Sequence, residues 1–146
     1  MEITRIRMLR GPNLWSRHTA LEAIVTCEVN ERSIDAIPQF ETKIRERFPQ
    51  LGSMRRGGYT EVLSLAHALE HAALGLQAQA GCPVTFSRTV QTIDEGVYQV
   101  VVEYIEEVVG RMAFDFGFAL IQATLNDAPF DLTAALSELE ALYEDV

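Results

Sequence analysis

Three residues with metal-binding and proton-transfer chemistry fall within five positions of the chain, in the order His67-Ala68-Leu69-Glu70-His71. Residues four apart lie on the same face of a helix, so the imidazoles of His67 and His71 can reach one tetrahedral zinc ion. Glu70 flanks that face, where a carboxylate can accept a proton from a water activated by the metal. The spacing therefore predicts a zinc-dependent hydrolytic site with Glu70 as its catalytic base.

A zinc site of this kind needs a third ligand. The order His-x-x-Glu-His resembles that of the inverted zincins, which take a carboxylate from a later segment. Glu103 is the first candidate, because it follows three valines and a carboxylate in such surroundings is costly unless it is paired or bound to metal. Glu107 is the alternative, since it lies one turn from Glu103 if both residues are helical. The competing interpretation is a histidine pair that is simply solvated or buried in a core.

The elements that must position these residues follow from the apolar pattern and the turn residues. A helix is predicted over residues 60–80, with Thr60 as N-cap, Val62 among its apolar positions and Gly81 just beyond its end. Strands are predicted over 2–9, 20–29, 83–91 and 97–104, and further helices over 38–48 (with Pro38 in the first turn), 105–125 and 132–144. The predicted fold class is α+β: a small, mostly antiparallel sheet with helices packed on one face and the metal site on a central helix.

Length and charge limit the classes of function. The 146 residues fit a single domain, 1–146, and Cys27 and Cys82 are expected to be buried free thiols. The net charge of −9 is uneven, because residues 1–60 carry 10 basic and 7 acidic residues and residues 61–146 carry 2 and 14. This argues against a nucleic-acid partner and favours binding of cations. Without an apolar run of about 18 residues or a basic and apolar leader, we expect a cytoplasmic protein with no membrane span.

Several segments, taken in chain order, form a distinctive set. They are Arg10-Gly11-Pro12-Asn13-Leu14-Trp15-Ser16, Arg56-Gly57-Gly58, the helix from His67 to Gln77, Gly96-Val97-Tyr98-Gln99-Val100-Val101-Val102-Glu103-Tyr104, and Gly110-Arg111. In this order they resemble the N-terminal domain of cyanophycin synthetase, over nearly all of residues 1–145. Two positions depart from the family pattern: Ser87-Arg88-Thr89 stands where Gly-Arg-Thr is common, and Val108 replaces an acidic residue.

The resemblance implies an activity and a set of partners. The family enzyme joins aspartate and arginine into cyanophycin by means of an ATP-grasp and a Mur-ligase-like domain, neither of which this sequence contains. The chain is therefore expected to be an excised domain, with the remaining synthetase domains as partners, or a stand-alone relative, with a homo-oligomer possible. In the family this domain anchors the polymer, and with an intact His-x-x-Glu-His set it resembles a metallohydrolase that cuts cyanophycin to make primers. The alternative is a non-catalytic anchoring or structural domain.

The polymer is zwitterionic, since each unit carries a guanidinium and a carboxylate. Arg56 and Arg88 are expected to bind its carboxylates, because a guanidinium can hold a carboxylate through two parallel hydrogen bonds. Glu107 is expected to bind its guanidinium groups, together with the other carboxylates of the acidic half, Glu103, Glu106 and Asp115.

Overall fold

An open sheet of four antiparallel strands forms one layer of the fold. The structure is a computed structural model and describes residues 1–11, 19–52 and 62–145. Its strands are β1 (Glu2–Leu9), β2 (Ala20–Thr26), β3 (Ser87–Gln91) and β4 (Val97–Glu103). They lie in the order β1-β2-β4-β3, so β2 and β4 are central and β1 and β3 are the edges.

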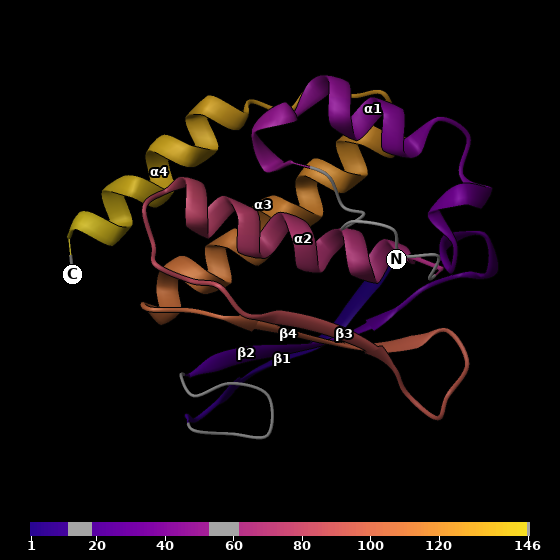
Figure 1. Ribbon diagram of the computed structural model, residues 1–146, viewed down its shortest axis with the longest axis horizontal. Coiled ribbons are helices and arrows are strands. Elements are labelled where there is room, and N and C mark those ends of the chain that lie inside the picture. The colour runs from indigo at the N-terminus through magenta and orange to yellow at the C-terminus, as the bar shows by residue number, and fades with distance from the viewer. Residues whose placement is uncertain (12–18, 53–61, 146) are drawn as a thin grey trace.

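Helices cover one face of this sheet (Figure 1). They are α1 (Phe40–Arg47), α2 (Leu65–Gln79), α3 (Glu107–Leu125) and α4 (Leu132–Glu144), and short 3-10 turns span Val29–Glu31, Ile34–Ala36 and Pro49–Leu51. Among the described residues, no helix lies on the opposite face. The arrangement confirms the predicted α+β class, with an antiparallel sheet and helices on one side.

The main elements occur in the predicted order, but several predicted boundaries are wrong. The strand predicted over 20–29 ends at Thr26, because the chain turns into a 3-10 helix at Val29. The strand predicted over 83–91 begins only at Ser87. The helix predicted to have Pro38 in its first turn begins at Phe40, after Gln39, whose φ of 60° lies in the left-handed region.

The start of α2 also differs from the prediction, whereas its end agrees with it. Thr60 lies outside the described residues, and the N-cap is Ser64, whose hydroxyl accepts a hydrogen bond from the backbone N–H of His67. Val62 precedes the helix and is exposed. At the other end, Gly81 has a φ of 97° and its N–H donates to the carbonyl of Ala78. A left-handed glycine at this position closes the helix, as predicted.

The strand register assigns residues to the two faces of the sheet. Side chains alternate between the faces along a strand, and residues directly opposite each other share a face. Leu21 lies opposite Val102, and both are buried in the core with the helices. Glu22 and Val101, the next opposite pair, therefore belong to the other face. We call the face that carries Leu21 and Val102 the covered face, and the face that carries Glu22 and Val101 the open face.

The central helix α2 packs on β3 and β4 and against α3. Its contact with α3 is close, because a Cβ added at Gly117 would lie 3.2 Å from the Cβ of Ala72. By length and composition alone, α3 could also span a membrane, even though charged residues interrupt its apolar sequence. Half of the apolar window of α3 is buried inside the fold.

Candidate functional site

Glu70 of α2 is held at both of its carboxylate oxygens by the edge strand β3. The hydroxyl of Ser87 donates to Oε2 at 2.6 Å, and the hydroxyl of Thr89 donates to Oε1 at 2.7 Å. Both residues reach α2 because they occupy alternate positions of β3 and share the covered face. Two donors fix this half-buried carboxylate in one orientation.

His67 is oriented by the N-cap of its own helix. The backbone N–H of Ser64 donates to Nδ1 of His67 at 3.1 Å, and the Ser64 hydroxyl lies 3.0 Å from the same nitrogen. A backbone N–H donates only to an unprotonated nitrogen, which places the proton of a neutral ring at Nε2. If Nδ1–H instead donates to the hydroxyl, Nε2 has a lone pair for a metal. In that tautomer Nδ1–H would face the Ser64 N–H, so a metal at Nε2 would require the ring to turn away from the N–H and keep only the hydroxyl as its partner.

His71 and Tyr98 also lie near His67. Nε2 of His71 is buried, one helical turn beyond His67. The ring of Tyr98, from β4, meets the His67 ring edge-on at a centroid distance of 6.2 Å. Burial raises the pKa of Tyr98, so its phenol stays protonated near neutral pH. The structure thus brings together the predicted His67, Glu70 and His71 within one turn of α2, beside hydroxyl groups that the sequence did not indicate.

The predicted third ligands are placed elsewhere. Glu103 is the last residue of β4, and its register places it on the open face, where Oε1 accepts the backbone N–H of Thr85 at 2.9 Å. Glu107 begins α3, and its Oε2 accepts a hydrogen bond from Arg111 at 3.3 Å. The imidazole pair has donor chemistry that fits zinc. In the described ranges, however, no three His, Cys, Asp or Glu side chains are grouped to hold a metal ion.

The structure describes only one of the two arginines that were predicted to bind substrate. Arg56 lies outside the described residues. Arg88 lies opposite Val101 and belongs to the open face, whereas its neighbours Ser87 and Thr89 face Glu70. The structure therefore separates Arg88 from the α2–β3 site, which we define as Ser64, His67, Glu70, His71, Ser87 and Thr89.

The open face carries a network of charged residues of its own. The side chain of Glu22 is only 3% exposed, and its carboxylate binds Arg5, Arg7 and Gln99 at 3.3, 2.7 and 2.6 Å. Burial alone would raise the pKa of Glu22, but the hydrogen bonds from Arg7 and Gln99 and the charges of both arginines outweigh burial and lower it. Arg7, Glu22, Val101 and Arg88 lie opposite one another across all four strands.

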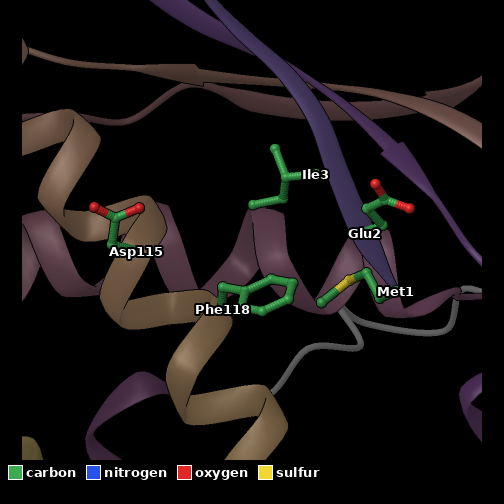
Figure 2. Close-up of a pocket in the computed structure, with 5 residues that line it drawn as sticks. All are labelled: Met1, Glu2, Ile3, Asp115 and Phe118. Carbon is green, nitrogen blue, oxygen red and sulfur yellow. The ribbon is translucent and has the colours of Figure 1, made fainter.

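A pocket of about 330 Å³ lies at the start of β1 (Figure 2). It is lined by Met1, Glu2 and Ile3 of the N-terminal segment and by Asp115 and Phe118 of α3. The N-terminal ammonium is paired with Glu31 at 2.6 Å. Asp115, one of the carboxylates expected to bind guanidinium groups, thus lines this pocket rather than the α2–β3 site.

Comparison with known proteins agrees with the resemblance noted in the sequence. Residues 23–126 match the family described as the cyanophycin synthase-like N-terminal domain. The chain is 34% identical to a cyanophycin synthetase of Trichormus variabilis and 33% identical to one of Geminocystis herdmanii, over 99% of this chain in both cases. A cyanophycin synthetase of Synechocystis sp. is 31% identical. The chain spans only 18% of the length of each of these relatives.

Proposed function

Because the chain belongs to the cyanophycin synthase-like N-terminal domain family, we propose that it binds cyanophycin and cleaves it by hydrolysis at the α2–β3 site, which generates primers for synthesis. The observation that carries this proposal is the fixed carboxylate of Glu70, in the same helical turn as two imidazoles. A carboxylate held by two donors beside potential metal ligands is the arrangement that general-base hydrolysis needs.

In this proposal Glu70 moves the proton. It accepts a proton from the attacking water as the new C–O bond forms, and it returns that proton to the nitrogen as the amide C–N bond breaks. Ser87 and Thr89 orient the carboxylate through both of its oxygens, so that the basic lone pair is positioned before substrate arrives. The hydroxyl donors thus act on the reaction through Glu70.

His67 and His71 are the proposed zinc ligands. Zinc at this position would supply Lewis-acid activation of a water and of the scissile carbonyl. The contact of Ser64 with Nδ1 of His67 fits the usual support of a metal-binding imidazole, whose second nitrogen is hydrogen-bonded. Glu103 and Glu107 remain the proposed third ligands, and either would have to move to reach the pair.

The proposal is tested by incubating the chain with purified cyanophycin, with and without a chelator, and measuring product length. We expect shorter polymer, and none when the chelator is present. Glu70→Gln keeps the shape and removes the base, so cleavage should fall at least about a hundredfold while zinc content and polymer affinity stay close to those of the wild type. Glu140→Gln makes the same change at an exposed carboxylate of α4, away from the site, and this control variant should cleave the polymer at the wild-type rate.

Metal content gives a separate test. The purified protein should carry close to one zinc per chain, and His67→Ala/His71→Ala should lose both zinc and cleavage. Full zinc occupancy in the double variant would contradict the assignment of the ligands. Cleavage by Glu70→Gln at the wild-type rate would instead show that another group is the base.

A second candidate function, anchoring of the polymer without cleavage, is favoured by the open face. The half-exposed side chains of Arg5 and Arg7 and the exposed side chain of Arg88 lie there, and guanidinium groups suit the carboxylates of a zwitterionic polymer. Arg5→Gln/Arg7→Gln should then weaken polymer binding, and the wild-type affinity should fall as salt screens the ion pairs. Binding by a wild type that does not cut would favour this candidate over hydrolysis.

A further inference from the structure

The outer edge of β3 presents a regular set of backbone groups. The N–H of Glu103 donates to the carbonyl of Phe86 at 2.9 Å, and the N–H of Thr92 donates to the carbonyl of Val97 at 2.9 Å. Hydrogen-bonded pairs alternate along an antiparallel ladder, so the even-numbered residues of β3 direct their backbone groups to β4. Ser87, Thr89 and Gln91 therefore direct their N–H and C=O groups away from β4.

This edge has no strand against it in the described part of the chain. The sheet order ends at β3, whose one strand partner is β4. An edge with unpaired N–H and C=O groups is a template for another extended chain. Ser87 and Thr89, whose backbone groups point outward, have short polar side chains that turn toward α2, so a second backbone can approach there to the usual strand spacing of about 4.8 Å.

The edge and the α2–β3 site share two residues. The backbone groups of Ser87 and Thr89 point outward along the edge, while their hydroxyls hold the carboxylate of Glu70 on the covered face. A chain paired to this edge would thus run beside Glu70. Successive side chains of that chain would point alternately toward α2 and toward the open face, on which Arg88 lies.

We propose that the outer edge of β3 binds the extended polyaspartate backbone of cyanophycin as a fifth strand, which brings one of its amide bonds beside Glu70. This inference rests on the proposed function, since it names how the substrate reaches the same site. Backbone pairing provides affinity and direction, and the alternating faces then select among side chains. Side chains on one face of the bound strand would lie beside α2, and those on the other face would lie on the side of Arg88, an exposed guanidinium that can bind a carboxylate of the polymer.

Amide hydrogen exchange of the Glu70→Gln variant of this chain tests the proposal without cleavage. Soluble short-chain cyanophycin at saturation should slow exchange of the Thr89 and Gln91 amides at least about tenfold, because they become hydrogen-bonded. The amides of Arg88 and Val90 are already in the ladder with β4 and should change little. A bound polymer that leaves Thr89 and Gln91 unprotected would overturn the proposal, as would changes confined to Arg5 and Arg7 on the open face.

A pair of substitutions at Gln91 tests the same edge by affinity. Gln91→Pro removes an outward N–H and leaves the ladder with β4 intact, which an edge strand tolerates. Polymer affinity should fall about three- to tenfold, whereas Gln91→Ser, which keeps the N–H, should bind like the wild type. Equal affinities for the two variants would contradict the proposal. Because binding and product length are measured separately, loss of hydrolysis with intact edge protection would remove the proposed cleavage and leave this inference standing.

Discussion

The backbone N–H and the hydroxyl of Ser64 both meet Nδ1 of His67, at 3.1 and 3.0 Å, so one residue serves as the N-cap of α2 and as the support of an imidazole. Nδ1 accepts from the N–H in the tautomer protonated at Nε2, and it can donate to the hydroxyl only if the ring turns away from that N–H. Only the second of these tautomers presents a lone pair at Nε2, and the hydroxyl is therefore the group through which Ser64 would favour metal binding.

Ser64→Ala removes that hydroxyl and keeps the backbone N–H. We expect a loss of about 1 kcal/mol in the free energy of unfolding, because an N-cap is lost. Zinc affinity should also fall about ten- to a hundredfold, since Nδ1–H loses its acceptor. Ser64→Thr keeps the hydroxyl and should restore both quantities. Denaturant unfolding and zinc titration measure the two effects, and unchanged zinc affinity in Ser64→Ala would contradict the positioning role.

Thr89→Val tests the orientation of Glu70. Valine matches threonine in shape and in strand propensity but cannot donate to Oε1, so the carboxylate becomes less well positioned. Cleavage of cyanophycin should fall about ten- to a hundredfold, with little change in the melting temperature. Thr89→Ser, which keeps a hydroxyl, should retain most of the activity. Equal cleavage by the valine and serine variants would show that the hydrogen bond has no part in the reaction.

Glu22→Gln tests the network on the open face. A carboxyl whose pKa is lowered on folding stabilises the fold above its unfolded pKa, and this stabilisation is lost as pH falls through the folded pKa. At pH 7 the substitution should lower the free energy of unfolding by about 1–2 kcal/mol, a figure reduced because Arg5 and Arg7 are half exposed. The difference from wild type should shrink as the pH falls below the ordinary pKa of a glutamate and through the lowered pKa of Glu22, where its carboxyl becomes protonated. A difference independent of pH would contradict an ionic origin.

Gly110→Ala tests the packing of α3 against the end of β4. A Cβ at Gly110 would lie 2.8 Å from the Cβ of Tyr104, which is closer than real Cβ contacts allow. We expect destabilisation of about 1–3 kcal/mol despite the higher helix propensity of alanine. Gly75→Ala is the matched control, because its Cβ would meet only the flexible end of Leu51, at 3.2 Å. Thermal unfolding should show a clear loss for Gly110→Ala and little change, or a gain, for Gly75→Ala.

The sequence alone determined those features that depend on neighbours along the chain. The spacing of His67, Glu70 and His71 placed them in one turn of a helix, because i and i+4 positions share a helix face whatever the fold around them. Gly81 marked the end of that helix, since its left-handed conformation is a local requirement. The α+β class likewise followed from apolar periodicity. The prediction of Thr60 as the N-cap was wrong, because several residues before the helix have capping chemistry. In the structure the helix begins after Ser64, whose hydroxyl caps it.

Only the tertiary structure decided what lies opposite that helix. Ser87 and Thr89 follow Glu70 by 17 and 19 residues in the chain, and they reach it because β3 pairs with β4 in one particular register. The same register places Glu103 and Arg88 on the open face. A shift of one residue would reverse every side chain of a strand between the faces, so the placement of these residues depends on strand pairing that no local pattern specifies.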